Sequence, residues 1–189
     1  MIRAFVGIRI DPEVTRRIRE AQARLEKPLK RIRWVKDESL HLTLKFLGEI
    51  PEERVAAAGD ALERATRGRE SFVFGCRGLG VFPDIRRPRV LWVGLEGKWL
   101  VPLAAAVDER LEAVGFARER REFKPHLTLG RWREFDGRTD LLRQQLEGWK
   151  DHDFGVSPVN EVIFFQSVLK PDGAIYTPLR IFPLGGNAG

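Results

Sequence analysis

Two of the three histidines in the chain begin the same four-residue segment, His-Leu-Thr-Leu, at residues 41–44 and 126–129. A histidine has an ordinary pKa near 6.5, so one copy can be neutral while another is protonated near neutral pH. A threonine hydroxyl can donate a hydrogen bond to a phosphate oxygen. Hydrolysis of a phosphodiester needs a base for water and an acid for the departing oxygen. The repeated pattern therefore indicates phosphoester chemistry, with His41 and His126 as the acid–base pair.

Strand geometry predicts which side chains of the two segments share a face, because alternate residues of a strand point to opposite sides. The face that packs into a core is expected to carry Leu42, Leu44, Phe46, Leu127 and Leu129. The opposite face is expected to carry His41, Thr43, Lys45, His126 and Thr128. If the two strands lie together, two imidazoles and two hydroxyls meet on one surface.

The spacing of 85 residues between the two motifs is close to half of the chain, which indicates a structural duplication. A less specific interpretation is that both histidines are structural and hydrogen-bonded within a sheet. That interpretation does not explain why threonine recurs at the same offset. No HExxH segment, carboxylate cluster or CxxC pair accompanies the histidines, so we expect no metal and no cofactor.

The elements that must position these motifs alternate between strand-like and helix-like segments. Alternating apolar residues predict strands at residues 2–10, 41–47, 72–80, 90–95 and 126–131. Helical spacing predicts helices at residues 12–25, 55–65, 100–114 and 141–146. A Lys-Pro-Asp-Gly turn at 170–173 predicts a hairpin of residues 159–169 and 174–182. This arrangement favours an α+β fold with antiparallel sheet.

Composition restricts the class of protein. The chain has 189 residues, 43% of them hydrophobic and 32% charged, which is typical of one globular domain spanning residues 1–189. No segment has the length of apolar sequence that a membrane span needs, and no secretion signal is visible. The single cysteine, Cys76, excludes an internal disulfide. We expect a cytoplasmic monomer.

The net charge of +6 is carried largely by arginine, which makes two-pronged contacts to phosphate. The run Arg86-Arg87-Pro88-Arg89 could guide RNA or could be a solvated turn.

Several segments together resemble the 2H phosphoesterase superfamily, and more closely its RNA 2′,3′-cyclic 3′-phosphodiesterases, also called 2′-5′ RNA ligases. The resemblance rests on residues 3–6, 34–35, 40–48, 78–83, 88–94 and 123–131 and extends over almost the full length. It implies a bilobal α+β fold, in which two antiparallel sheets flank a central cleft and the helices lie outside. It also implies hydrolysis of RNA ends or nucleotides with a 2′,3′-cyclic phosphate to a 2′-phosphate.

The resemblance further implies roles for individual residues. His41 would be the base and His126 the acid, although the near symmetry of the motifs does not fix that choice. Thr43, Thr128 and Arg131 would hold the phosphate, and Phe82 would stack on a base. Strict alternation from His126 puts Arg131 on the leucine face. Either the strand ends or bulges at Gly130, or Arg131 is only a surface charge.

Two other functions remain open at this point. The first is 2′-5′ ligation of RNA or tRNA fragments as the main activity, which is the reverse direction of the same chemistry. The second is a non-catalytic module that binds RNA or nucleotides. Both complete His-x-Thr motifs are present, which argues against a binding module without turnover.

Overall fold

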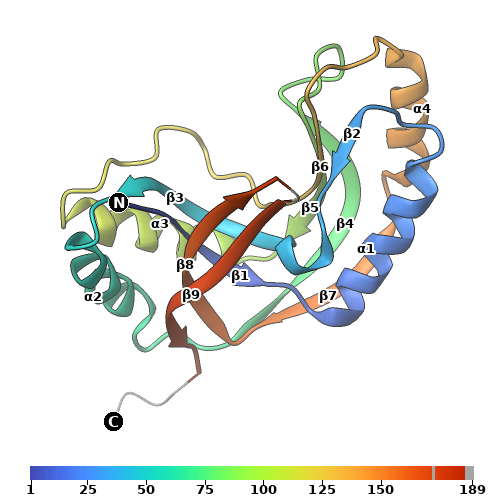
Figure 1. The fold of residues 1–189 in the computed structure, drawn as a ribbon. Helices are drawn as coiled ribbons and strands as arrows, with labels where there is room; N and C mark the ends of the chain where they lie inside the picture. Colours follow the sequence, from blue (N-terminus) through green and yellow to red (C-terminus); the bar gives the residue numbers. More distant parts are fainter. Residues whose placement is uncertain (172, 186–189) are drawn as a thin grey trace.

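A strongly curved antiparallel sheet runs through the whole molecule, with helices packed on its outside (Figure 1). The structure, a computed structural model, describes residues 1–171 and 173–185. Within these residues the elements in chain order are β1 (Ile2–Arg9), α1 (Pro12–Leu25), β2 (Ile32–Trp34), a 3-10 turn (Asp37–Ser39), β3 (His41–Ile50), α2 (Arg54–Thr66), β4 (Phe72–Phe82), β5 (Val90–Glu96), α3 (Leu100–Glu112), β6 (His126–Trp132), α4 (Thr139–Trp149), β7 (Asp153–Val159), β8 (Glu161–Lys170) and β9 (Gly173–Pro183).

The sheet consists of two halves that meet at one residue pair. The strand order is β7-β4-β5-β6-β3-β1-β8-β9, and β2 pairs with the end of β6 on the same side as β3. Between β6 and β3 the only paired residues among those described are Leu42 and Leu127. We call β3, β1, β8 and β9 the His41 half, and β2, β6, β5, β4 and β7 the His126 half. The predicted α+β fold with two antiparallel sheets is confirmed, as two halves of one curved sheet.

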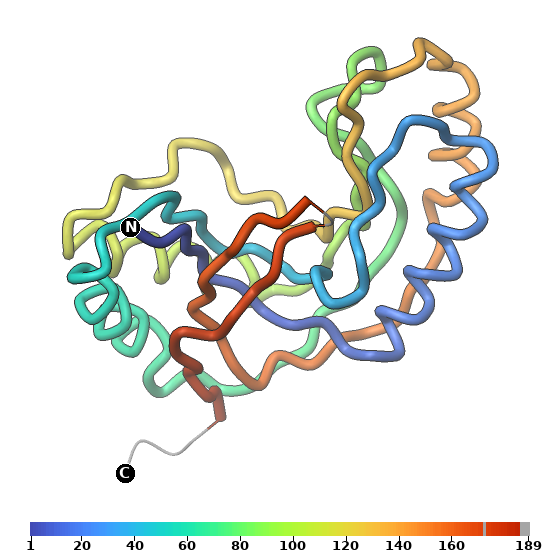
Figure 2. Tube along the Cα trace, in the orientation of Figure 1, coloured from blue at the N-terminus to red at the C-terminus, as the bar shows by residue number. Residues whose placement is uncertain are grey.

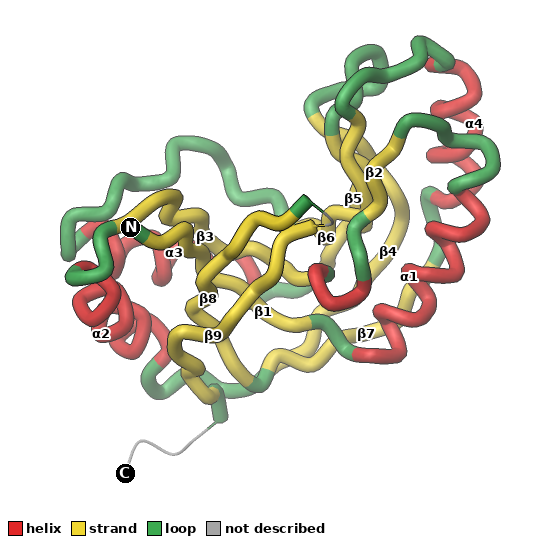
Figure 3. Tube along the Cα trace, viewed as in Figure 1, coloured by secondary structure: helices red, strands yellow, loops and turns green. Residues whose placement is uncertain are grey.

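Each half has its own pair of helices (Figure 3). Helices α2 and α3 pack against each other and against strands of the His41 half, whereas α1 packs on β7 and α4 on β4. Helix α1 begins where the sequence predicts, because Asp11 accepts a hydrogen bond from the backbone N–H of Glu13 at 2.8 Å and Pro12 follows it. The segment between α3 and β6, yellow in Figure 2, crosses from the His41 half to the His126 half.

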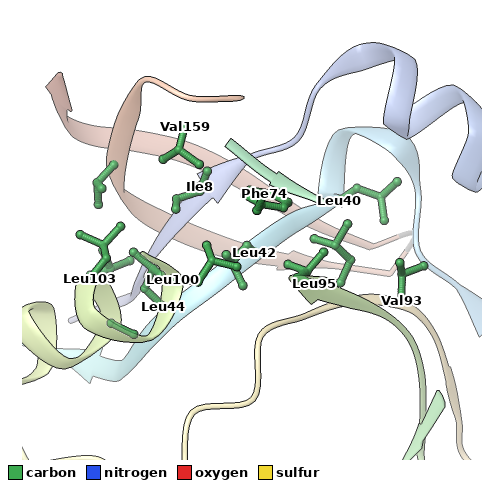
Figure 4. Packing of buried hydrophobic residues seen from close by; sticks show 14 of the residues in the cluster. Ile8, Leu40, Leu42, Leu44, Phe74, Val93, Leu95, Leu100, Leu103 and Val159 are labelled. Carbon is green, nitrogen blue, oxygen red and sulfur yellow. The ribbon is translucent and has the colours of Figure 1, made fainter. Parts of the chain in front are cut away.

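One hydrophobic core joins the two halves. Figure 4 shows Leu42 of β3 packed between Leu100 of α3 and Leu95 of β5. Leu42 and Leu127 are both fully buried, and burying a leucine side chain stabilises a fold by about 1.5–3 kcal/mol. The leucines of the two motifs therefore anchor the strands that carry the histidines. None of the helices in the described residues has the length and apolar character of a membrane span.

Two strands were not predicted. The sequence patterns do not indicate the short β2 or the edge strand β7. β7 contains Gly155 and Pro158, which are unusual inside a strand. Pairing with β4 nevertheless holds β7 in the sheet. The predicted hairpin is confirmed as β8 and β9, with Asp172 of its turn outside the described residues.

The face assignment after Leu44 was wrong, because β3 bulges at that residue. Val6 of β1 pairs with Lys45 and Gly7 pairs with Thr43, so Leu44 has no partner of its own. A bulge of this kind shifts the alternation by one residue. Lys45 therefore lies in the core at 6% exposure, where it forms an ion pair with Asp108, and Phe46 is 56% exposed.

Candidate active site

The four polar residues of the two motifs meet where the halves of the sheet join. Leu42 and Leu127 pair in an antiparallel register, and a register centred on this pair sets His41 across from Thr128 and Thr43 across from His126. Both leucines point into the core, so the histidines and threonines share the opposite face. The histidine and threonine of each motif therefore lie on one face beside those of the other motif.

Both imidazole rings are held in the same way by the backbone. The Nδ1 of His41 lies 2.7 Å from the carbonyl oxygen of Ser39, and the Nδ1 of His126 lies 2.7 Å from that of Lys124. A carbonyl oxygen only accepts, so Nδ1 must donate in both rings. In the neutral ring Nε2 is then the unprotonated nitrogen, which can accept a proton from a reactant.

The surroundings of His41 are mostly aromatic. Its ring centroid lies 4.7 Å from that of Phe5 and 4.8 Å from that of Tyr176. The Thr43 hydroxyl lies 2.9 Å from Nε2 and can donate to it. Burial lowers the pKa of His41 to about 4, and the positive charges of Arg131 and His126 act in the same direction against the hydrogen bond to Ser39. His41 is therefore neutral at pH 7.

His126 is in a less enclosed position. Phe82 meets its ring edge-on at a centroid distance of 4.9 Å. Within the described residues, the Nε2 of His126 and the hydroxyl of Thr128 make no hydrogen bond. Burial lowers the pKa of His126 as well, with the charge of Arg131 adding to the effect and the Lys124 carbonyl opposing it.

Arg131 reaches this face because β6 contains a second bulge. Trp92 of β5 pairs with Thr128 and Leu91 pairs with Gly130, which leaves Leu129 without a partner. The bulge lies at the fourth residue of the motif, as in β3. It places Gly130 on the core face and Arg131 on the face of His126, where its charge acts on both histidines. The strand therefore does bulge, at Leu129 and not at the expected Gly130.

Phe82 is part of an aromatic wall beside His126. Its ring lies 5.1 Å from that of Trp92, which faces Thr128 on the neighbouring strand. The Trp92 indole lies flat over Gly80, where a Cβ atom would come within 2.1 Å of it. Glycine is therefore required at this position for the wall to form.

Sequence reasoning missed three aromatic residues of the site: Phe5, Trp92 and Tyr176. A signal existed for Trp92, because alternation with Leu91 and Val93 places it on the face opposite the core. No local pattern singles out Tyr176, which comes from the distant strand β9. Burial raises the pKa of the Tyr176 hydroxyl, while the charges of Arg131 and Arg3 act in the opposite direction.

The remaining basic candidates have defined positions. The backbone N–H groups of Arg86 and Arg87 donate to the Asp84 carboxylate at 2.8 and 3.1 Å, which orders the turn and leaves both side chains exposed. In the part of the chain that the structure describes, no three His, Cys, Asp or Glu side chains are grouped closely enough to hold a metal ion.

The sequence profile of the LigT-like phosphoesterases matches the chain twice, at residues 8–92 and 94–176. The chain belongs to the LigT-like phosphoesterase family. Each of the two matched segments contains one His-Leu-Thr-Leu motif. The duplication inferred from the motifs thus coincides with two consecutive matches to the same family.

Relatives in this family are similar over almost their full length. A protein of Archaeoglobus fulgidus named RNA 2′,3′-cyclic phosphodiesterase is 34% identical over 184 residues, covering 96% of this chain and 99% of the relative. One of the same name from Aquifex aeolicus is 34% identical over 192 residues, covering 98% and 99%.

Solved structures have the same fold. A crystal structure of a Thermus thermophilus protein superimposes with a TM-score of 0.82 at 32% identity, covering 98% of this chain and all of the other. Escherichia coli LigT complexed with 3′-AMP superimposes with a TM-score of 0.78 at 24% identity, covering 98% and 99%, and shares the fold.

Proposed function

We propose that this protein hydrolyses the 2′,3′-cyclic phosphate at RNA ends to a 2′-phosphate by a two-histidine mechanism that uses no metal. The observation that carries the proposal is the convergence of two His-Thr motifs on one face, with both Nδ1 atoms held by backbone carbonyls. The names of the family relatives support the same substrate class.

In the first half of the reaction, His41 acts as the base. Its Nε2 is unprotonated at neutral pH, because burial lowers the pKa of the ring to about 4. The Nε2 lone pair takes a proton from a water molecule, and the water oxygen forms a bond to phosphorus. The Thr43 hydroxyl, 2.9 Å from Nε2, must turn from the nitrogen toward the water or a phosphate oxygen at this stage.

In the second half, His126 acts as the acid. The bond from phosphorus to the 3′ oxygen breaks, and the Nε2–H of protonated His126 gives its proton to that oxygen. Burial and the charge of Arg131 lower the pKa of His126 in the free protein. A bound phosphate anion acts in the opposite direction and favours the protonated ring. Proton exchange with water then restores both histidines.

Three further residues bind the phosphate in this scheme. Thr43 and Thr128 donate hydroxyl hydrogen bonds to its oxygens, and Arg131 offsets the negative charge that develops in the transition state. Phe82, beside His126, stacks on the base of the terminal nucleotide, a contact worth about 1–3 kcal/mol.

The test is to incubate the protein, with EDTA present, with a short RNA that ends in a 2′,3′-cyclic phosphate, and to identify the product. A 2′-phosphate end is expected. A 3′-phosphate end would contradict the assignment of the 3′ oxygen as the leaving group. Tight binding without turnover would instead support a binding module, and turnover only with added divalent metal would contradict the mechanism.

We also propose that the enzyme works as a single bilobal domain and a monomer in the cytoplasm. One hydrophobic core containing residues of both halves supports a single domain. The lone cysteine, Cys76, is buried, and burial raises the pKa of its thiol to about 12, as suits a structural cysteine. Light scattering at the protein concentration of the activity assay measures the mass in solution and so tests whether the protein is a monomer.

A further inference from the structure

We infer that Arg33, beside the Arg131 that binds the reacting phosphate, forms a second phosphate site, which holds the phosphodiester on the 5′ side of the reacting ribose. The inference rests on the proposed function and adds to it a substrate class, namely RNA chains in preference to single cyclic nucleotides. Arg33 lies outside both motifs, on the short strand β2 that sequence patterns did not predict.

The backbone places Arg33 directly beside Arg131. The two residues are partners in the antiparallel pairing of β2 with β6, so their side chains lie on the same face with Cβ atoms about 5 Å apart. Ile32 and Trp34 point to the other face, because a Cβ atom on Gly130 would meet them at 2.4 and 3.3 Å. Arg33 is therefore on the same face as the histidines, and both arginines are exposed.

Within residues 1–171 and 173–185, neither of these two arginines forms an ion pair, in contrast to other arginines nearby. Arg31 and Arg138 form ion pairs with Glu134 and Asp136. Arg33 instead donates from Nη2 to the backbone carbonyl of Pro171 at 2.9 Å, which leaves other donors of its guanidinium available. Like charges directly opposite each other on neighbouring strands destabilise a sheet. Two neighbouring phosphates, one at each arginine, would offset this repulsion.

The position of the pair fits a phosphate next to the reacting one. The charge of Arg131 acts on His41, His126 and Tyr176, so its guanidinium is within Coulombic range of the reacting groups. Arg33 lies on β2, which pairs with β6 on the same side as β3, beyond the Leu42–Leu127 pair. The corresponding position after the bulge in β3 is Phe46, an exposed aromatic side chain that offers a phosphate no donor. The RNA chain is therefore expected to leave the site over β2 and β6.

The experiment compares kcat/KM for two substrates, a nucleoside 2′,3′-cyclic phosphate and a dinucleotide with the same cyclic end. The ratio of dinucleotide to mononucleotide should fall about tenfold in Arg33→Ala, because a charge-assisted contact to the added phosphate is lost. Arg33→Lys should retain part of the ratio. Arg110→Ala, which removes an equal charge from the outer helix α3, is the matched control and should leave the ratio unchanged.

A dinucleotide with a neutral methylphosphonate linkage identifies the contact. The wild type should lose the same factor on this substrate, and Arg33→Ala should lose nothing further. An unchanged ratio in Arg33→Ala, or an equal loss on both substrates with a lower Tm, would overturn the inference and leave Arg33 as an anchor for the β8–β9 turn. If the wild type turns over neither substrate, the proposed function fails. The preference for the dinucleotide is then measured as the ratio of the Kd values of the two 2′-phosphate products.

Discussion

The two halves of the site have the same motif and the same bulge but different residues around them. In the His41 half the bulge is followed by Lys45, buried against Asp108, and by the exposed Phe46. In the His126 half it is followed by Gly130 and the exposed Arg131. Positive charge is thus neutralised in the core of one half and presented at the surface of the other. A duplicated backbone can therefore carry two different chemical environments.

The histidines differ accordingly. His41 packs between Phe5 and Tyr176 and is hydrogen-bonded at both ring nitrogens. His126 contacts Phe82, and within the described residues only its Nδ1 is bonded. The more enclosed ring is suited to remain neutral and accept a proton, and the more open ring to exchange protons with a substrate.

The largest effect is expected from removing either histidine. His41→Ala and His126→Ala should each lower kcat by about 100-fold to 10,000-fold, because each loses one proton transfer, while binding of RNA remains. Single-turnover kinetics with a cyclic-phosphate RNA measures this. His152→Ala is the control, since His152 packs on Trp149 and Phe154 and should not affect kcat. Unchanged rates in both His41 and His126 variants would exclude the acid–base pair.

Lys45→Met should affect stability instead of chemistry. It removes the buried cation from Asp108 and leaves only the exposed Arg118 at 3.8 Å, so we expect a loss of about 3 kcal/mol or less in the free energy of unfolding. Urea unfolding measures the loss. Lys150→Met, at an exposed pair with Glu147, should cost less than about 1 kcal/mol. Equal losses in both variants would contradict a structural role for the buried pair.

Arg131→Ala should have the opposite profile to Lys45→Met, with lower activity and little change in stability. We expect kcat/KM to fall about 10-fold to 100-fold, since a charged donor to the phosphate is lost. Arg131 lowers the pKa of both histidines, so both values should rise in the variant. A pH titration of the histidine ring protons by NMR tests the shift, and an unchanged titration would contradict the placement of Arg131.

The smallest effect concerns the pH profile. In the free protein His41 must be neutral and His126 protonated, so the plot of kcat/KM against pH should be bell-shaped. The pKa of His41, about 4, sets its acidic limb, and the pKa of His126, which lies below the ordinary 6.5, sets its alkaline limb.

Thr43→Val removes a hydrogen bond to neutral His41. The pKa of His41 should therefore rise by a few tenths of a unit, and the acidic limb should move to higher pH. Thr128→Val should leave that limb in place.

Sequence alone determined the motifs and most of the elements that carry them. Asp11 and Pro12 mark the start of α1 because capping is a local interaction. The strands β3 and β6 follow from alternation within a few residues, and the repeat of a rare residue type singled out His41 and His126 as candidates. These features can be recognised in short segments of sequence without knowledge of strand pairing.

Tertiary structure decided which residues surround the histidines. The bulges at Leu44 and Leu129 exist because β1 and β5 each provide one residue fewer opposite them. A pattern within one strand does not reveal the number of residues in its partner, so Lys45, Phe46 and Arg131 could not be assigned to a face beforehand. Tyr176 lies far along the chain from either motif, and Arg33 lies on a strand that no pattern predicted. Their positions depend on strand pairing, which is a property of the whole sheet.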